Sequence, residues 1–597
     1  MYMNIIVLIF VLSIGYAWMI RGVFNALIHL LCALAAGAIA FAVWEPLALM
    51  LIEMSPERGF LSLLEKVAWG VSLVVPFVVV FIILRTLTDK LISNNIKNAA
   101  VIDYIGGGAC GLATGIICAG ILVIGIGTMR VPTNFLGYQP MGYSDDRTTG
   151  GGSIVRGDKL WIPVDTITAK VYNTLSIGTM SSNEPLAKWY PELELVGITS
   201  RISPSNGSGR NAISPDDFKI KATYFVGDPK ATLPVNELLK DLTNDRTQKY
   251  VDVENEPVSK GYLAGYVVEF EPGAKERGEK GGQLVVSNGQ YRLLISDDDG
   301  NTNSVFPVAV ISESSEPDQY GRWRFDTPDV FITSVGGKSR VLMAFEYVIP
   351  EGFTPVAFQA KNIRVLTDTF PEPIKFAMPI QRDLLVRSGS LLRGESFTKR
   401  VLDTTNTITY DPTQRPSSGF SLIQQTIKVG EMMSTQVARR GFTIDEKNLV
   451  VDGEGEWLVK TEVGRKNAPM GKSLRVEKYA VAPGQSLIRV DVGPESVFGL
   501  LSDPAREAPL DQPILLIDES GNEYEAIGFE YTDSEIFHAR LTRGSTVNGI
   551  QDVPSITRSR SDQKLQLLFV VTRGVKITHF VIGNVAIAEF SPPVETN

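Results

Sequence analysis

The pattern G-x-G-x-x-G, from Gly106 to Gly111 in the stretch YIGGGACGLATGII (residues 104–117), has the spacing that holds a dinucleotide in many enzymes. It does so when a strand precedes it, a helix opens at it, and an acidic residue follows about 20 positions later to bind the ribose. Here no charged residue occurs from Tyr104 to Met129, and the next one is Arg130. A segment this long and apolar is typical of a membrane span, so we expect no nucleotide cofactor.

The small residues of the same segment are better suited to helix packing than to phosphate binding. Gly107, Gly111, Gly115 and Ala119 recur at every fourth position, so they lie on one face of a helix. Small residues at this spacing let a neighbouring helix approach closely within a membrane. We therefore predict that this face is a helix-packing surface.

Three polar side chains of the apolar segments are further candidates for function. Asn25 and His29 lie one helical turn apart, and Asp103 stands at the start of the glycine-rich segment. Intramembrane polar groups often line a proton or solute pathway. An Asn and a neutral His also hydrogen-bond between helices, and Asp103 can lie at the cytoplasmic interface, so we favour a structural role.

A cluster of oxygen-bearing side chains in the C-terminal region imitates the start of a calcium loop. Asp297, Asp299 and Asn301 alternate as calcium ligands do, but Thr302 stands where the turn glycine belongs and Val308 where the bidentate acid belongs. A tight hairpin turn explains these residues better. We therefore expect no metal site here.

The N-terminal candidates must be positioned by apolar helices long enough to cross a membrane. The first apolar segment lacks the basic region of a signal peptide and is followed at once by a second, so we expect it to be retained. Basic residues at Arg21 and from Arg85 to Lys97 predict that these loops face the cytoplasm and that the C-terminal region lies outside. The four segments span residues 1–20, 22–44, 67–84 and 104–129.

The arrangement of these motifs resembles the colicin V production protein (CvpA) family of bacterial inner-membrane proteins. The resemblance covers about the first 130 residues and rests on Asn4, the pair Arg21-Gly22, and Asp103 followed by glycines 107, 111 and 115. It implies a four-span domain in the inner membrane and a link to colicin V production, export or envelope maintenance. The chain departs from the family at Asn4, where an acid is usual, and at Asn25, Ala26 and Thr114, where charges are frequent.

Some members of this family carry a trypsin-like protease on the outer side, which supports an outside C-terminal region and invites a search for a triad. A triad needs a His to take the proton from a Ser. Outside the spans the only histidines are His538 and His579, and no G-x-S-x-G string occurs. We therefore expect no enzyme activity and no cofactor.

Composition limits the partners of the C-terminal region. The first 130 residues hold 7 Lys and Arg and 6 Asp and Glu, so the rest of the chain holds 50 basic and 60 acidic side chains. Its net charge of about −10 argues against nucleic acid and gives no general attraction to anionic lipid. All three cysteines (Cys32, Cys110 and Cys118) lie within the spans. The C-terminal region therefore has no disulfide and depends on its apolar core.

Beyond residue 218, short runs of Val, Ile, Phe and Tyr broken by Gly, Pro and Asp predict antiparallel strands. Two strings repeat with the same interval of 59 positions: LLISDDDGN (293–301) matches LLIDESGN (515–522), and GFTPVAFQAKN (352–362) matches GVKITHFVIGN (574–584). This repetition predicts a duplicated module. The copies look like immunoglobulin-like β-sandwiches, with Phe358 and Phe580 in their cores.

A short helix is predicted between the spans and the strands. Pro163 suits its first turn and Gly178 its end, and the apolar stripe consists of Trp161, Val164, Ile167, Val171 and Leu175. Such a stripe rests on a membrane surface or packs under the soluble domain, and its width favours packing.

The sequence therefore predicts a multidomain protein with a four-helix transmembrane bundle and an all-β extracytoplasmic region. We interpret it as a non-enzymatic envelope protein whose modules bind an envelope protein or the cell wall, with homo-oligomers possible; the alternative is an export accessory or small-solute channel. The predicted units are the bundle (1–130), a linker with the short helix and two flexible joints (131–217), the first sandwich (218–367), a connector (368–429) and the second sandwich (430–597).

Overall fold

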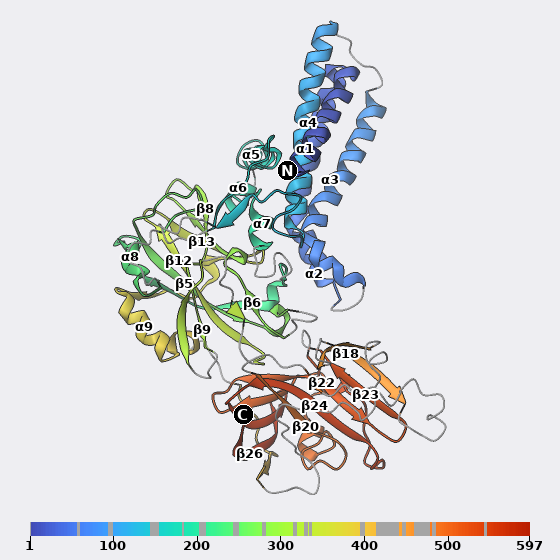
Figure 1. Cartoon of the computed structure of the whole chain (residues 1–597), viewed down its shortest axis with the longest axis vertical. Helices are drawn as coiled ribbons and strands as arrows, with labels where there is room; N and C mark the ends of the chain where they lie inside the picture. The colour runs from blue at the N-terminus through green and yellow to red at the C-terminus, as the bar shows by residue number, and fades with distance from the viewer. Residues whose placement is uncertain are drawn as a thin grey trace.

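A computed structural model of the chain places a helical bundle at one end, a first group of sheets beside its lower part and a second group farther away (Figure 1). Of the predicted joints, only residues 144–153 and 202–209 lie outside the described residues, as do 395–399 and 414–429 of the predicted connector; the described remainder contains β2 and the buried Arg210. The structure describes residues 2–56, 60–92, 99–143, 154–181, 184–201, 210–242, 250–276, 282–314, 319–326, 332–333, 337–394, 400–413, 441–444, 449–458, 478–479, 485–542 and 546–596.

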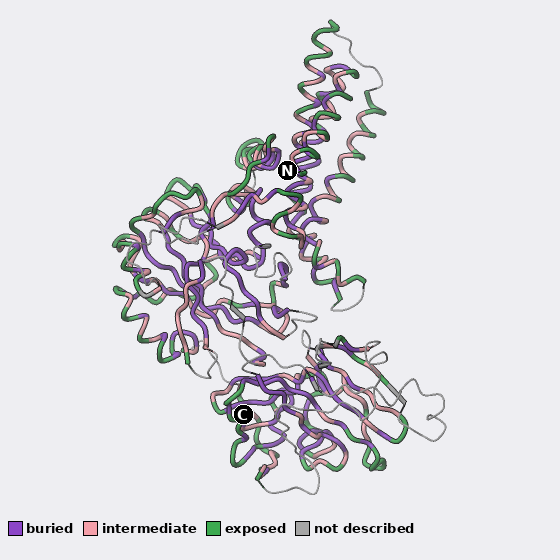
Figure 2. The backbone as a smooth tube through the Cα atoms, in the orientation of Figure 1, coloured by how far each residue is buried: buried purple, intermediate pink, exposed green. Residues whose placement is uncertain are grey.

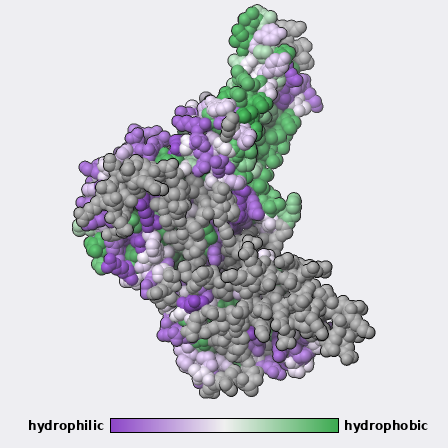
Figure 3. All heavy atoms as spheres, viewed as in Figure 1, coloured by the Kyte–Doolittle hydropathy of each residue, from purple (hydrophilic) through white to green (hydrophobic). Residues whose placement is uncertain are grey.

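Four helices form the bundle, and each is long and apolar enough to cross a membrane. Gly22, with a φ of 88°, makes the sharp turn between the first two. Apolar side chains cover the outside of the bundle, as the surface view shows (Figure 3). The helices are α1 (Tyr2–Arg21), α2 (Val23–Glu53), α3 (Leu63–Leu91) and α4 (Ala100–Thr128).

The two ends of the bundle have different surroundings. The end of α1, the start of α2, the end of α3 and the start of α4 lie at the free end (Figure 1). The other end, here called the base, contains the start of α1, the end of α2, the start of α3 and the end of α4. There the Arg130 N–H donates to the Lys66 carbonyl at 2.8 Å, and Met3 N–H donates to the Leu136 carbonyl at 3.1 Å. The chain leaves the bundle at this base.

The predicted short helix is α5 (Val164–Ile177), flanked by Pro163 and Gly178 as expected. It packs on the bundle, because an added Cβ at Gly120 of α4 would lie 2.0 Å from the Thr168 hydroxyl. The predicted stripe was therefore wrong in part: Trp161 is 62% exposed and Ile167 36%. Close approach to a helix requires small groups, so the buried face of α5 consists of Val164, Asp165, Thr168, Ala169 and Tyr172.

Short elements link the bundle to the sheets. The hairpin β1 (Met141–Tyr143) and β2 (Ile154–Arg156) is antiparallel, and two short helices follow α5. These helices are α6 (Leu186–Trp189) and α7 (Val196–Arg201).

The first β region contains two main sheets. In the larger one the strand order is β10-β9-β12-β5-β3-β15, with β4 beside β5, and in the smaller one it is β14-β13-β7-β8. The strands of the larger sheet are β3 (Phe218–Val226), β4 (Leu233–Pro234), β5 (Lys260–Phe270), β9 (Ala309–Glu313), β10 (Tyr320–Arg324), β12 (Val341–Pro350) and β15 (Ile374–Phe376). Those of the smaller sheet are β7 (Tyr291–Ser296), β8 (Thr302–Val305), β13 (Thr354–Ala360) and β14 (Ile363–Leu366).

The core of this region lies between the two sheets. Tyr291 of β7 stacks on Phe345 of β12 with ring centroids 4.5 Å apart, and Phe358 of β13 lies 5.5 Å from Tyr266 of β5. All four side chains are buried, at 2% exposure or less. Outside the two sheets the region has a short strand pair, β6 (Val285–Val286) with β11 (Ile332–Thr333), and the helices α8 (Val235–Leu238), α9 (Pro379–Arg387) and α10 (Ser390–Arg393).

The second β region has its own buried cluster, which includes Phe498, Phe569 and Phe580. Its strand order is β16-β26-β25-β21-β22-β23-β18-β17, with β19 beside β18 and β24 pairing with β20 and β22. The strands are β16 (Ile408–Tyr410), β17 (Phe442–Ile444), β18 (Leu449–Leu458), β19 (Lys478–Tyr479), β20 (Gln485–Asp491), β21 (Ile514–Asp518), β22 (Glu523–Thr532), β23 (Ile536–Leu541), β24 (Lys564–Thr572), β25 (Lys576–Ile582) and β26 (Val585–Glu595), with the helix α13 (Asp503–Glu507). Buried residues are concentrated in the strands of both regions (Figure 2).

The repeated strings occupy corresponding places in the two regions. β13 pairs with β7 and β14, as β25 pairs with β21 and β26; β12 pairs with β5 and β9, as β24 pairs with β20 and β22. Gly352 and Gly574, with φ of 87° and 83°, lead into β13 and β25. Phe358 and Phe580 on these strands are fully buried. The pairing pattern is therefore duplicated together with the sequence.

The turns of the two strings are also alike. The Asp297 carboxylate accepts the Asn301 backbone N–H at 2.8 Å, and Asp518 accepts that of Asn522 at the same distance. In each case the Asn side chain donates to the second carboxylate oxygen, at 2.9 and 2.7 Å. The oxygens that imitate a calcium loop thus close a hairpin turn.

Candidate functional site at the base of the bundle

The predicted glycine face of α4 lies against α1. A Cβ added at Gly111 would lie 2.8 Å from Trp18 Cβ, and one added at Gly115 would lie 3.1 Å from the backbone of Val11. At Gly107 the added atom would lie 2.7 Å from the Trp18 carbonyl oxygen. Ala119 is buried in a cluster with Val11. All four small residues therefore face one helix.

The intramembrane polar residues lie toward the free end of the bundle. His29 packs between rings, 4.1 Å from Trp18 and 4.8 Å from Phe81 by their centroids. The Asp103 carboxylate accepts the Val23 backbone N–H at 3.4 Å, at the first turn of α2. Asn25 is partly buried on the same helix. His29 is thus held by packing between rings, although its Nδ1 is buried without a hydrogen-bond partner among the described residues, and Asp103 caps α2.

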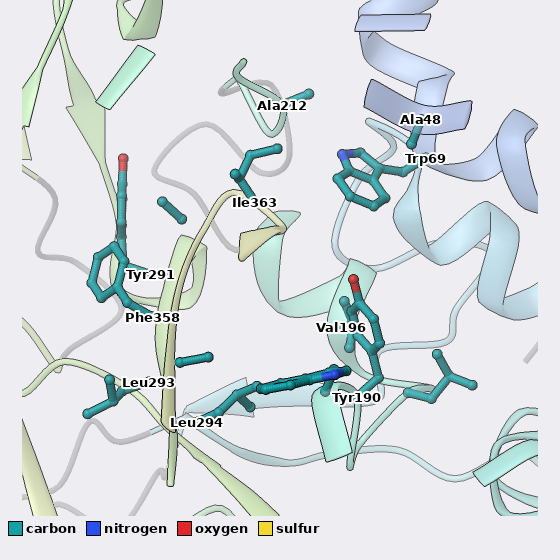
Figure 4. Close-up of a cluster of buried hydrophobic side chains, with 14 of the residues drawn as sticks. Ala48, Trp69, Tyr190, Val196, Ala212, Tyr291, Leu293, Leu294, Phe358 and Ile363 are labelled. Atoms are coloured by element: carbon teal, nitrogen blue, oxygen red, sulfur yellow. The ribbon is translucent and has the colours of Figure 1, made fainter. Parts of the chain in front are cut away.

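At the base, one apolar cluster runs from the helices into the first β region (Figure 4). Trp44 of α2 donates its indole N–H to the Trp69 carbonyl of α3 at 2.7 Å, and its ring lies 5.2 Å from that of Tyr190. The same cluster continues through Val196 to Ile363 of β14. The membrane helices and the first sheets therefore share a core.

A buried ion pair also joins these parts. Arg210, just before the first sheet, donates from Nε to the Glu65 carboxylate of α3 at 2.7 Å, and both side chains are more than nine-tenths buried. The guanidinium further donates to the carbonyls of Gly273 and Lys275, and Glu276 accepts the Arg210 backbone N–H at 2.9 Å. Neither sequence motif nor spacing indicated this pair, because its members are 145 positions apart.

Beside this pair lies a fully buried lysine. Lys361, in the turn from β13 to β14, has its Nζ 4.0 Å from Glu276, and no described residue accepts a hydrogen bond from it. Burial lowers the pKa of Lys361 to about 8, while the Glu276 carboxylate opposes that shift. The polar groups of the junction therefore stand in a poorly solvated environment.

Two pockets open near the base. The first, of about 490 Å³, is bordered by β2 and α5, and its charges pair in part, with Arg156 contacting Glu194 at 3.0 Å and Glu254 at 2.6 Å. Tyr138 in its wall donates to Asp165, and burial together with that carboxylate raises the pKa of the Tyr138 phenol. The second pocket, of about 380 Å³, is bordered by α2, α5, α6 and Arg364 of β14.

A second polar junction connects the two β regions. The buried Glu523 carboxylate pairs with Arg340 at 3.0 Å and with Arg400 at 3.0 Å. Ser339 adds backbone contact by donating its N–H to the Glu523 carbonyl at 2.7 Å. Charge-assisted hydrogen bonds thus join β22 of the second region to Arg340 of the first region and to Arg400.

The histidines of the second β region lie among strand side chains. His538 lies 2.8 Å from Glu454 of β18, and His579 lies 2.9 Å from the Thr578 hydroxyl. Both contacts are within or between neighbouring strands.

Compared with known proteins, the chain matches no family model, no curated protein and no solved structure.

Proposed function

We propose that this chain is a non-enzymatic envelope protein of a bacterial inner membrane, similar to the CvpA family in its bundle. In this proposal the bundle anchors two related immunoglobulin-like β-sandwich modules outside the cytoplasm, where they contact an envelope protein or the cell wall. The chain presents these modules at a set position relative to the membrane.

The observation that carries this proposal is the junction at the base of the bundle. The shared apolar cluster and the Glu65–Arg210 pair fix the first sheets to α2 and α3. A flexible linker would need neither a continuous core nor a buried ion pair. The junction therefore favours a protein that holds its outer region in a fixed orientation.

The arrangement of the spans favours anchoring over the alternative, an export accessory or channel. A conducting pathway needs polar groups that face a water-filled cavity or one another. His29 instead packs between two rings, and Asp103 caps α2. The four small residues of α4 contribute close packing with α1.

The duplicated pairing pattern supports two related modules. In each region two hydrogen-bonded strands carry the two repeated strings, one string on each strand, and the Phe of the second string lies in a buried cluster. The two regions differ at one strand. In the second region β22 pairs with both β21 and β24, whereas in the first region β8 pairs with β7 and a separate strand, β9, pairs with β12. An interruption of one strand is a small change for a duplicated sandwich.

Orientation is tested by labelling single cysteines in intact spheroplasts with a membrane-impermeant maleimide, after the three native cysteines are replaced by serine or alanine. We expect Asp298→Cys, on an exposed turn of the first region, to react in intact spheroplasts. Lys90→Cys, at the free end of the bundle, should react only after permeabilisation. The reverse pattern would place the β regions in the cytoplasm and overturn the proposal.

Anchoring and conduction are separated by reconstitution of the full chain in liposomes. We expect proton and small-solute fluxes equal to those of empty liposomes. A protein-dependent flux that His29→Ala or Asp103→Asn abolishes would favour the channel alternative instead.

A further inference from the structure

The second pocket at the base combines apolar walls with a polar rim. Phe41, Ala42 and Leu175 contribute apolar surface, whereas Glu45, Glu184 and Arg364 contribute charge. Trp189 also lines the pocket, and its ring stacks under the Arg364 guanidinium at 4.3 Å. A volume of about 380 Å³ is within the range of small-molecule sites.

Helix lengths place this pocket at the surface of the membrane that the helices cross. The 20 residues of α1 rise about 30 Å, the thickness of a hydrocarbon core, so Tyr2 marks its surface. The Asn4 side chain accepts the Trp161 N–H at 2.7 Å, which holds α5 at that level. On α2, about 20 residues separate the free end from Ala42 of the pocket wall.

Two hydrogen-bond donors that line this pocket lack acceptors among the described residues. The indole Nε1 of Trp189 is buried without a partner, in a side chain only 4% exposed. Nη1 of Arg364, in a side chain that is 19% exposed, is also buried without a partner, and the Glu184 carboxylate lies 3.8 Å from it. Its Nη2 already pairs with Glu45 at 3.2 Å. Buried donors in native proteins are normally satisfied, so the pair points to an acceptor that occupies the pocket.

We propose that this pocket binds the head group of a zwitterionic phospholipid of the phosphatidylethanolamine class. The phosphate accepts from Trp189 Nε1 and Arg364 Nη1, as arginine commonly does for phosphates. Glu184, which is 57% exposed at the rim, faces the ammonium group. The acyl chains lie against Ile39 and Val43, exposed apolar residues of α2 next to the pocket wall.

The charge of the pocket selects a zwitterion over a net anion. Among the residues that line it, Arg364 is balanced by Glu45, and Glu184 adds a further negative charge. The Lys188 ammonium lies over the Trp189 ring at 4.4 Å but does not line the pocket. An anionic phosphatidylglycerol would place its phosphate beside this second carboxylate without a compensating ammonium group. Like charges at such distances disfavour binding in a partly desolvated site.

The test uses the full chain purified in detergent, stripped of lipid and supplied with phosphatidylethanolamine or phosphatidylglycerol, with bound lipid counted by native mass spectrometry. We expect Trp189→Phe, which keeps the ring, and Arg364→Gln to weaken phosphatidylethanolamine binding by about tenfold, the effect of losing one hydrogen bond to a charged group. Trp161→Phe, an exposed indole outside the pocket, is the matched control and should bind normally. Glu184→Gln should reduce the preference for phosphatidylethanolamine.

Thermal unfolding of each variant shows whether it is folded. Arg364→Gln loses the contact with Glu45 and can unfold for that reason. Trp189→Phe does not touch this contact, so its lipid binding still decides the test. Normal phosphatidylethanolamine binding by folded Trp189→Phe, or equal binding of both lipids by the parent chain, would overturn the proposal. Displacement of the lipid by millimolar inorganic phosphate would assign the pocket to a soluble phosphate instead. We expect no such displacement, because the acyl chains contribute apolar burial.

Discussion

Replacing Arg210 with methionine removes the charge at the base of the bundle while keeping a side chain of similar length. The Glu65 carboxylate, which is 7% exposed, then loses its partner at 2.7 Å. The carbonyls of Gly273 and Lys275 lose a donor as well. The Glu65 carboxylate and the hydrogen bond to Lys275 are buried, so water does not readily replace the guanidinium there.

The magnitude follows from breaking a buried ion pair. Removal of one partner of a buried ion pair costs about 3 to 5 kcal/mol. In a unit as large as the bundle and the first β region together, an unfolding entropy of about 2.1 cal/mol/K per residue makes this a decrease of about 4 to 6 °C in the unfolding temperature. Combining Arg210→Met with Glu65→Leu removes both charges, so we expect the double variant to recover a large part of the loss.

The assay is scanning calorimetry of the full chain in detergent. Arg506→Met is the matched control, because Arg506 is 56% exposed and its pair with Asp503 at 3.3 Å should contribute less than about 1 kcal/mol. An Arg210→Met transition within about 1 °C (roughly 1 kcal/mol or less) of the control would refute the reasoning. So would a double variant no more stable than Arg210→Met, because loss of the Glu65–Arg210 ion pair would then not be the cause.

Three further predictions concern other parts of the molecule. Gly111→Ile should lower the thermal stability and membrane accumulation of the chain, because its Cβ would lie 2.8 Å from Trp18, whereas Gly108→Ile, with its nearest contact at 3.7 Å, should be tolerated. Phe580→Ala should cost about 3 to 5 kcal/mol and shift only the calorimetric transition of the second β region, since Phe580 belongs to a separate cluster; a shift of every transition would contradict this. Burial alone would raise the pKa of Glu346, but two arginines outweigh it and hold that pKa at about 2. Because the pKa of Glu346 is lowered in the folded protein, its ionised carboxylate stabilises the fold fully above about pH 4.5. This stabilisation is lost as the pH falls toward 2. Glu346→Gln should therefore flatten the dependence of unfolding on pH between these values, and an unchanged slope would refute it.

Local patterns were enough to predict the helices and the repeated strands. Long stretches without charged residues identified the four apolar helices. Small residues at every fourth position identified the face of α4 that contacts α1. Period-two alternation placed Phe358 and Phe580 inside. These features depend on neighbours within a few residues, which is the range over which periodicity carries information.

Contacts between distant segments were not predictable in this way. The pairing of Glu65 with Arg210 joins an apolar helix to a stretch rich in Gly and Ser, and neither sequence indicates the other. β15 and β16 are three-residue strands in the predicted connector and pair in parallel with β3 and β26. Strands this short carry too few residues for alternation to be recognised. The buried face of α5 differs from its apolar stripe because small and polar groups fit against Gly120.

The central claim is that the bundle holds the first β region in one orientation. It is tested most directly by the distance distribution between two spin labels, measured by pulsed electron resonance on the full chain in lipid nanodiscs. One label replaces Ile9 on the exposed face of α1 and the other replaces Asp298 on the first region, after replacement of the native cysteines. We expect a single distribution as narrow as that of a reference pair at Lys230 and Asp298, within the first region. A broad or multiple distribution, beside a narrow reference, would contradict the claim.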